Sequence, residues 1–234
     1  MKTIGLLGGM SWESSIEYYR IINEEIKHRL GGTYSAKIIM NSVNFHEIEV
    51  LQHNSEWEQL TNLMIEESKK LELAGADFLV ICTNTMHKMA NELQKNLSIP
   101  LLHIADATAK LVKDKDIQEI GLLGTKFTME EEFYKGRLEN MHKLNVILPN
   151  LDERNEIHRI IYDELVLGTI NYQSKEIYKD AISNLEKNGA QGVILGCTEI
   201  GLLIKPSDTN LPTFDTTFIH SIAAVDMALE GYVL

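Results

Sequence analysis

The stretches GADFLVICTNT, at residues 75–85, and GAQGVILGCTE, at residues 189–199, are two versions of one pattern. Each begins with a glycine and an alanine, continues with a short apolar run and ends in a polar turn that contains threonine. A short, continuous apolar run before a turn is typical of a strand that is buried in a parallel sheet. The second stretch begins 114 residues after the first, so we predict that the chain contains two copies of one β/α module.

Two further matches in the same order support this internal repeat. The stretch IGLLGG at Ile4–Gly9 returns as IGLLGT at Ile120–Thr125, an offset of 116 residues. Pro100 and Pro212 each adjoin a short apolar segment, at an offset of 112 residues. Three matches with a nearly constant offset predict two lobes of similar topology.

Short apolar runs alternate along the chain with longer amphipathic segments, the pattern of strands and helices around a parallel sheet. The expected strands are Thr3–Leu7, Lys37–Val43, Phe78–Cys82, Leu101–His103, Glu119–Leu123, Asn145–Leu148, Gly192–Gly196 and Thr213–Phe214. The expected helices are about Ser14–Leu30, Glu56–Leu73, Glu153–Val166, Lys175–Lys187 and Phe218–Leu229, with one more from Thr128 and a crossover near Asp106–Lys113.

Two helix starts are predicted from the spacing of polar residues. Ser14 and Glu17 are spaced as a capping box, with two glycines after Leu30 as the stop. Thr128 is followed by Glu131 at the same spacing, so we expect a second helix to begin there.

The predicted fold class is α/β, with two pseudo-symmetric lobes that each contain a parallel-sheet β/α module. We expect residues 1–104 and 211–234 to form the first lobe and residues 105–210 the second. In this arrangement the C-terminal helix returns to complete the first lobe, and the active site lies in the cleft between the two.

The composition excludes several classes of partner. The 234 residues include 34 acidic and 22 basic side chains, a formal net charge of −12, which argues against nucleic acid or an anionic membrane surface. A small acidic ligand stays possible, because a few local donors can outweigh the overall charge.

The first residues and the cysteines predict where the protein works. The stretch MKTIGLLGG has one lysine and a short apolar run, so we expect a buried strand there and neither a signal sequence nor a membrane span. Two distant cysteines make neither a disulfide framework nor a metal-ligand cluster. We therefore expect a reduced, cytoplasmic setting and no metal.

The repeat decides which residue corresponds to Cys197. At the offset of 114 residues, Cys82 aligns with Gly196, and Thr83 aligns with Cys197. Both Thr83 and Cys197 follow the carboxyl end of a predicted strand, where open parallel sheets bind ligands. Two facing lobes would put these residues on opposite walls of one cleft, whereas Cys82 is expected in the core.

At this point four motifs carry a family resemblance. GLLGGMSWES, CTNTMH, the turn GLLGT with its later threonine, and GCTEIGLL occur in this order. Together they resemble the aspartate/glutamate racemase family over essentially the whole chain, with the L-aspartate/glutamate-specific members most similar.

The resemblance implies a cofactor-independent racemase with two lobes, often a homodimer, and a thiol on each lobe. The first thiol belongs to a Cys-Asn-Thr motif and the second to a Gly-Cys-Thr motif. This chain departs from the pattern, because Thr83 stands at the position of the first thiol.

Other candidate site residues surround these two positions. Asn84, Thr85, Thr198 and Glu199 can cap helices or bind a carboxylate, and Met10 and Ser11 follow glycines that allow close backbone approach. The resemblance implies that Gln52, Thr125 and Thr128 also approach the substrate. We expect His87 and His103 to be structural or to lie behind the site.

The resemblance therefore implies racemisation of an acidic amino acid without pyridoxal phosphate or another cofactor. A thiol near a helix N-terminus has a lowered pKa, so we expect Cys197 to act as a thiolate base. The resemblance implies that this thiol acts on the L-enantiomer. Thr83 would deliver a proton from the opposite face of Cα. The alternatives are a single-cysteine decarboxylase, a hydantoin or maleate isomerase of the same superfamily, and a carboxylate-binding protein without activity.

Overall fold

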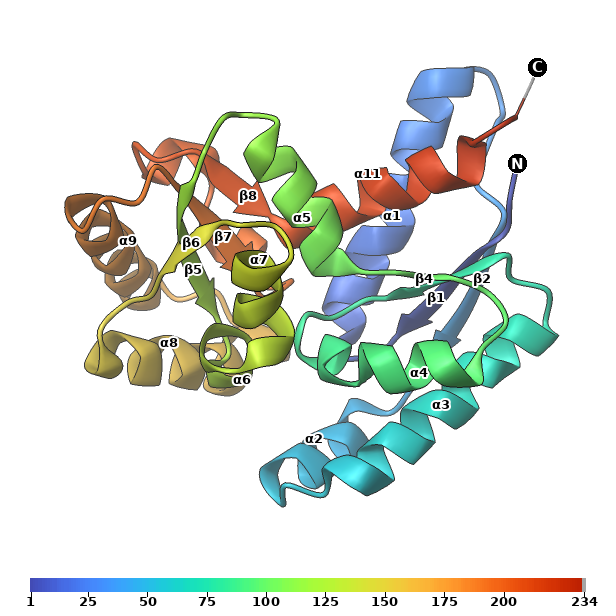
Figure 1. Ribbon diagram of the computed structural model, residues 1–234, viewed down its shortest axis with the longest axis horizontal. Coiled ribbons are helices and arrows are strands. Elements are labelled where there is room, and N and C mark those ends of the chain that lie inside the picture. Colours follow the sequence, from blue (N-terminus) through green and yellow to red (C-terminus); the bar gives the residue numbers. More distant parts are fainter. Residues whose placement is uncertain (233–234) are drawn as a thin grey trace. The chain divides into compact units, whose positions relative to one another are not determined.

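The computed structural model describes residues 1–232, which contain two parallel sheets of four strands (Figure 1). The first sheet has the order β2-β1-β3-β4 and consists of β1 (Ile4–Gly8), β2 (Ile38–Ser42), β3 (Phe78–Ile81) and β4 (Leu101–Leu102). The second has the order β6-β5-β7-β8 and consists of β5 (Glu119–Gly124), β6 (Asn145–Ile147), β7 (Gly192–Gly196) and β8 (Thr213–Asp215). The identical strand order confirms the predicted α/β fold with two copies of one module.

The register of the strands confirms the offsets of the sequence repeat. In the first sheet Ile4 pairs with Phe78, and in the second Ile120 pairs with Gly192. These pairs are displaced along the chain by 116 and 114 residues, as in the alignment. The alignment that matches Thr83 with Cys197 therefore rests on backbone pairing as well as on sequence.

The outer strands follow the same rule. Leu79 pairs with Leu101 in the first sheet, and Val193 pairs with Thr213 in the second. The step from Leu101 to Thr213 is 112 residues, which is the offset between the two prolines. The position after β4 thus corresponds to the last residue of β8.

The helices lie between the strands and include several short ones. The longer helices are α1 (Trp12–Leu30), α2 (Phe45–His53), α3 (Trp57–Leu73), α5 (Ile104–Lys113), α8 (Leu151–Asp163), α9 (Tyr172–Lys187) and α11 (Thr216–Leu229). The shorter ones are α4 (Ala90–Asn96), α6 (Lys126–Glu130), α7 (Arg137–Asn140) and α10 (Ile200–Leu203), with single turns at Thr85–Met89, Glu132–Gly136, Leu165–Leu167 and Pro206–Asp208. The sequence did not predict α2, α4, α7 or α10.

Both helix starts predicted from the polar spacing were wrong by three residues. Ser11 caps α1 and accepts a hydrogen bond from the N–H of Ser14, while Thr125 caps α6 and accepts one from the N–H of Thr128. In each case the true cap lies in the turn between the strand and the helix. The side chain of the true cap therefore accepts a hydrogen bond from the N–H of the residue that was predicted as the cap.

The chain forms two compact units, Met1–His103 with the segment from His220 onward, and Ile104–Ile219. The chain therefore returns to the first unit at His220, later than the expected residue 211. The reason is that β8 pairs with β7 and belongs to the second sheet.

In the first unit both faces of the sheet are covered by helices. Figure 1 shows α1 beside α11, and Ile22 of α1 and Val225 of α11 pack with Leu6 of β1 on this face. On the other face Met64 of α3 and Leu93 of α4 pack in one apolar cluster. Burial on both faces explains why the strands appear as continuous apolar runs in the sequence.

The second unit has one continuous core. Ile160 of α8, Tyr178 of α9 and Ile194 of β7 belong to it, as does Cys197. This apolar core fixes the strands and so positions the residues that follow them.

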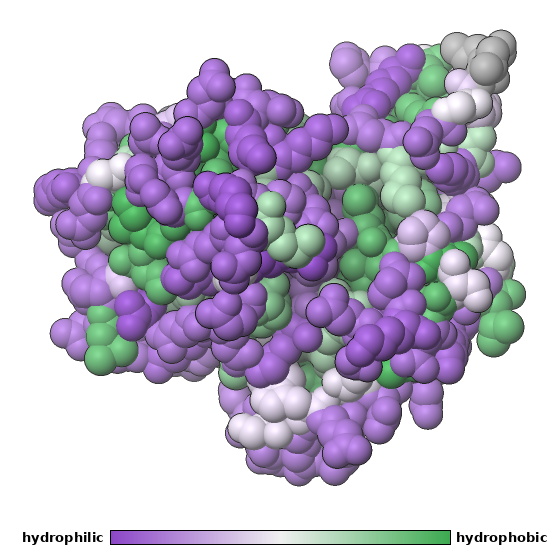
Figure 2. Space-filling model, in the orientation of Figure 1, coloured by the Kyte–Doolittle hydropathy of each residue, from purple (hydrophilic) through white to green (hydrophobic). Residues whose placement is uncertain are grey.

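Hydrophilic side chains cover most of the face shown in Figure 2, with apolar areas between them. Within residues 1–232 no helix combines the length and the apolar character needed to cross a membrane.

Candidate active site

The expected site residues of each unit follow the carboxyl ends of its strands. In the first unit Met10 and Ser11 follow β1, and Thr83 follows β3 after one residue. In the second unit Thr125 follows β5, and Cys197 follows β7. Since the strands of each sheet are parallel, these residues lie at the same edge of their own sheet.

Serine side chains hold the turn after β1. Ser15 Oγ donates to the main-chain oxygen of Ser11 over 2.8 Å and accepts from the N–H of Gly9 over 2.7 Å. Ser14 Oγ lies 3.1 Å from the same Ser11 oxygen and 3.4 Å from the main-chain oxygen of Cys82. The first turn of α1 thus ties the end of β1 to the end of β3.

Gly9 is required in this turn for two reasons. Its φ angle is +90°, a backbone conformation that L-residues with a side chain rarely adopt. A Cβ at this position would also collide with the backbone of Val43. The close backbone approach expected from the sequence is therefore present, although its partner is the chain after β2.

Thr83 is half-buried, and the two residues after it are buried. Asn84 precedes the single helical turn that starts at Thr85. The imidazole of His87, in the same turn, places Nδ1 at 2.8 Å from the main-chain oxygen of Thr83. That oxygen can only accept, so Nδ1–H of His87 donates and the imidazole supports the Thr83 turn from behind.

Behind Thr83 lies a buried cluster of imidazoles that includes a residue the sequence analysis missed. The ring centroids of His87 and His103 are 4.6 Å apart, and those of His87 and His220 are 5.7 Å apart. His220 Nε2 lies 2.9 Å from the Leu102 oxygen, and its Nδ1 lies 2.9 Å from the Tyr18 hydroxyl. Nε2 therefore carries the proton, and Nδ1 accepts from Tyr18.

Burial keeps His220 neutral. Its pKa is lowered to about 3, mainly by burial and further by the charge of a protonated His87, while the bond to Leu102 opposes the shift. The structural role expected for His87 and His103 therefore extends to His220 of α11. Little in the sequence indicates this role, because one histidine in an apolar helix is a common core residue.

Gln52 of α2 is 3% exposed, and its Oε1 has no hydrogen-bond partner within residues 1–232. A buried amide oxygen without a partner carries a free-energy cost of about 1–3 kcal/mol. The side chain is thus suited to receive a polar ligand atom.

Cys82 is fully buried in the first unit, as the repeat predicted. Burial raises the pKa of its thiol far above the ordinary value. A thiol of this kind packs as a small apolar group and is inert.

Cys197 has a different environment. Its Sγ donates to Oε2 of Glu199 over 2.9 Å, and the hydroxyl of Thr198 donates to the same oxygen over 2.8 Å. Cys197 is 9% exposed and Glu199 2% exposed. Three residues expected at the site are therefore joined in one hydrogen-bonded group.

The expected low pKa of Cys197 was wrong. Its pKa is raised well above the ordinary value, first by burial, then by the charge of the Glu199 carboxylate and by the hydrogen bond to it. Backbone hydrogen bonds from Glu199 and Thr198 oppose the shift. The helix that follows, α10, has only four residues, so it supplies little of the dipole on which the sequence argument relied.

The start of α11 fixes the turn that carries this group. Thr216 Oγ1 donates to the main-chain oxygen of Leu195 over 2.8 Å, and Thr217 Oγ1 lies 3.3 Å from that of Thr198. Asp215 caps the helix by accepting from the N–H groups of Thr217 and Phe218. Its carboxylate lies against Gly201, where a side chain would collide with it.

Thr125 and Thr128 are both buried, and their hydroxyl oxygens are 3.2 Å apart. The methyl group of Thr128 packs against the glycines at the ends of β5 and β7. Thr128 is thus a packing residue as well as part of the turn, and Thr125 is the helix cap.

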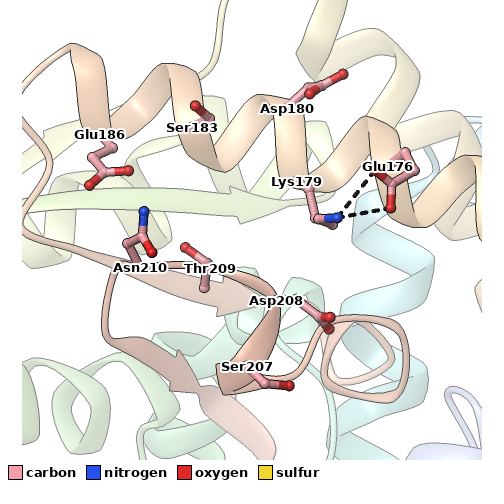
Figure 3. Close-up of a pocket in the computed structure, with 9 residues that line it drawn as sticks. All are labelled: Glu176, Lys179, Asp180, Ser183, Glu186, Ser207, Asp208, Thr209 and Asn210. Atoms are coloured by element: carbon pink, nitrogen blue, oxygen red, sulfur yellow. Dashed lines mark hydrogen bonds and ion pairs between the residues drawn. The ribbon is translucent and has the colours of Figure 1, made fainter.

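A separate groove of about 340 Å³ lies in the second unit between α9 and the segment before β8 (Figure 3). Its walls hold four carboxylates and Lys179, whose Nζ pairs with Glu176 over 2.9 Å. None of the expected site residues lines it. Its acidic character does not suit a dicarboxylate ligand.

Comparisons with known proteins agree with the fold. The family model of Asp/Glu/hydantoin racemases matches residues 7–225, so the chain belongs to this family. A Yersinia pestis protein assigned as an Asp/Glu racemase is 52% identical, with a TM-score of 0.91 over 98% of this chain and 100% of the other. An aspartate racemase homologue from Pyrococcus horikoshii OT3 is 35% identical, with a TM-score of 0.83 over 97% and 99%.

A further relative is the broad specificity amino-acid racemase RacX of Bacillus subtilis strain 168. It is 21% identical over an alignment of 230 positions, and the match covers 92% of this chain and 92% of the other. The family and these similar proteins support an amino-acid racemase, an isomerase, as the class of this protein.

Proposed function

We propose that this protein racemises aspartate or glutamate without a cofactor, with Cys197 and Thr83 acting at Cα. Cys197 removes the α-proton of the L-enantiomer as a thiolate, and Thr83 delivers a proton to the opposite face. The observation that carries this proposal is the shared strand register, which matches Thr83 to Cys197. The proposal requires that one bound substrate meets both residues.

The contacts of Cys197 support its role as the base. Unlike Cys82, it has a carboxylate that can take its proton and backbone N–H groups that can stabilise the thiolate. The negative charge that develops on the substrate needs donors that are fixed in advance. Polar groups of Ser11, Asn84 and Thr198 at the strand ends are candidates for this task.

The proposed binding residues are Met10, Ser11, Gln52, Asn84, Thr85, Thr125, Thr128, Thr198 and Glu199. The support for Gln52 is its buried Oε1, which can accept a hydrogen bond from the substrate ammonium group. Because O and N of an amide are assigned from their surroundings, the amide can also turn and donate to a carboxylate.

The preference for the L-enantiomer is kinetic. The equilibrium constant between enantiomers is unity, so kcat/KM must be equal for the L- and D-substrates. A hydroxyl is a far weaker proton acceptor than a thiolate, so we expect a lower kcat with the D-enantiomer. Because kcat/KM is equal for the two enantiomers, KM for the D-enantiomer must be lower by the same factor.

We further propose that the protein works as a homodimer in a reduced, cytoplasmic setting. Both cysteines are free, and α1 exposes Trp12, Ile16 and Tyr19 at helical spacing on one face. Light scattering of the purified protein tests the dimer, for which we expect twice the mass of the chain, 26.5 kDa.

The function is tested with EDTA-treated protein and five substrates: both enantiomers of aspartate and glutamate, and an arylmalonate. Chiral chromatography should reveal the opposite enantiomer of an acidic amino acid. Decarboxylation of the arylmalonate without racemisation would identify the single-cysteine decarboxylase instead. Binding of the amino acids with no product from any substrate would identify the inactive binding protein.

A further inference from the structure

The Cys197 thiol and the Glu199 carboxylate form a buried hydrogen-bonded pair. Sγ and Oε2 are 2.9 Å apart, and Thr198 Oγ1 donates to the same carboxylate oxygen over 2.8 Å. Burial disfavours a thiolate and a carboxylate side by side, so the pair resists the loss of the thiol proton to solvent.

We propose that Glu199 is a positioning residue that takes the thiol proton of Cys197 and so makes the thiolate available inside the buried site. This inference rests on the proposed function and assigns Glu199 a role beyond substrate binding. It explains how a buried thiol can act as a base near neutral pH.

The internal repeat supplies an independent observation. At the offset of 114 residues, Cys197 corresponds to Thr83 and Glu199 corresponds to Thr85. The half that has the thiol thus has the carboxylate two residues later, and the other half has threonine at both positions. The thiol and the carboxylate occur together, as expected for two groups that act as a pair.

Other titratable groups of the second unit face this pair. Tyr178 of α9 is buried, and its pKa is raised well above the ordinary value by burial and by the charges of Cys197, Glu199 and Glu164. Asp215 of β8 lies against Gly201, two residues after Glu199, and burial raises its pKa.

The proton transfer balances without another reactant. The Cys197 S–H bond breaks as the proton passes to Oε2 of Glu199, which gives a thiolate and a neutral carboxylic acid. The thiolate then takes the α-proton, and the electron pair of the Cα–H bond stays on the substrate. The negative charge moves from the pair to the substrate, so no additional charge is created in the buried site.

The test is the pH dependence of Cys197 alkylation by iodoacetamide, followed by peptide mass spectrometry in a Cys82→Ala background. Only the thiolate reacts. Where thiol and carboxylate share one proton, the thiolate fraction is independent of pH between the two apparent pKa values. We expect the rate to change less than about threefold from pH 5.5 to 7.5.

Glu199→Gln removes the proton acceptor and keeps the size of the side chain. Its alkylation rate should rise about tenfold per pH unit, or about a hundredfold over the same range. Its racemase kcat at pH 7 should fall by at least about a hundredfold. Glu199→Asp retains a carboxylate and should restore the flat alkylation profile.

Thr198→Val is a second test that keeps the carboxylate in place. Without the Thr198 hydroxyl the carboxylate is a stronger base, so alkylation at pH 6.5 should be faster than in the parent. This variant keeps the proposal falsifiable if Glu199→Gln does not fold.

Three results would overturn the proposal. The first is a steep pH profile in the parent protein, and the second is no alkylation of Cys197 from pH 5.5 to 7.5. The third is a flat profile retained in Glu199→Gln. Because alkylation needs no amino acid, a parent with the predicted profile but without racemisation would disprove the proposed function and leave the Cys197–Glu199 pair intact.

Discussion

Thr83 and Cys197 occupy the same position in two copies of one module. Cys197 follows Gly196, the last residue of β7, and Thr83 follows Cys82, the residue aligned with Gly196. The register of β1 with β3 equals that of β5 with β7 once the offsets of 116 and 114 residues are applied. The N–H of Cys82 bonds to the Leu7 oxygen over 2.9 Å, so Cys82 continues the strand and Thr83 is the first residue beyond it. This relationship leads to the following predictions.

Cys82→Ala should retain most of the racemase activity, whereas Cys197→Ala should lose it. Cys82 is fully buried in the apolar core of the first unit, so its loss costs about 1–2 kcal/mol of unfolding free energy. Activity and urea unfolding of both variants provide the measurements. If Cys82→Ala proved inactive while folded, the register argument would be wrong by one residue.

Thr83→Cys should raise kcat with the D-enantiomer by at least about tenfold, because a thiolate replaces a hydroxyl as the proton acceptor. Thr83→Val is the matched control, since it keeps the shape of the side chain and removes the hydroxyl. It should lose racemisation of both enantiomers. Saturation kinetics with D-aspartate and D-glutamate measure the effect, and equally high kcat for both enantiomers in the unmodified protein would exclude an asymmetric site.

His220 should make the protein less stable as the pH falls. Its pKa is lowered to about 3 in the folded protein, so between pH 6.5 and 3 the unfolded chain binds more protons. This contribution to stability is complete above pH 6.5 and is lost at lower pH, by about 1.4 kcal/mol per pH unit.

The matched variant is His220→Gln, which can still accept from Tyr18 and donate to Leu102. Between pH 6.5 and 5 the parent should lose about 2 kcal/mol more unfolding free energy than this variant. Urea unfolding at both pH values provides the comparison. Parallel pH dependences would show that His220 is not buried in its neutral form.

Gly9→Ala should destabilise the fold more than Gly31→Ala. Both glycines have positive φ angles, but a Cβ at Gly31 meets open space, whereas one at Gly9 meets the backbone of Val43. The shared backbone strain is about 1–2 kcal/mol, and the collision adds about 1–3 kcal/mol at Gly9. Equal losses in urea unfolding would contradict the tight turn after β1.

The fold was predictable from the sequence because its strands are buried on both faces. Such strands are continuous apolar runs, as in Phe78–Ile81, and the repeat fixed their order in both units. The exact helix starts were not predictable, because Ser11 and Ser14 are both good caps and only the geometry after β1 selects Ser11.

The placement of the candidate residues after the strand ends was predictable, but their electrostatics were not. Cys197 and Glu199 are two residues apart in one motif, but this spacing does not reveal that their side chains touch, and a low pKa was expected for the thiol. Burial and the 2.9 Å contact with the carboxylate reverse that shift. His220 was missed because its partners, Tyr18 and Leu102, are more than 100 residues away in the chain.

The most direct test of the central claim is proton NMR of L-aspartate and L-glutamate in D₂O with metal-free parent protein and with Cys197→Ala. The account predicts that the parent replaces the Cα proton of at least one of them by deuterium and forms the D-enantiomer, while Cys197→Ala does neither. Exchange that persists in Cys197→Ala, or activity of the parent that requires an added divalent ion or cofactor, would contradict it.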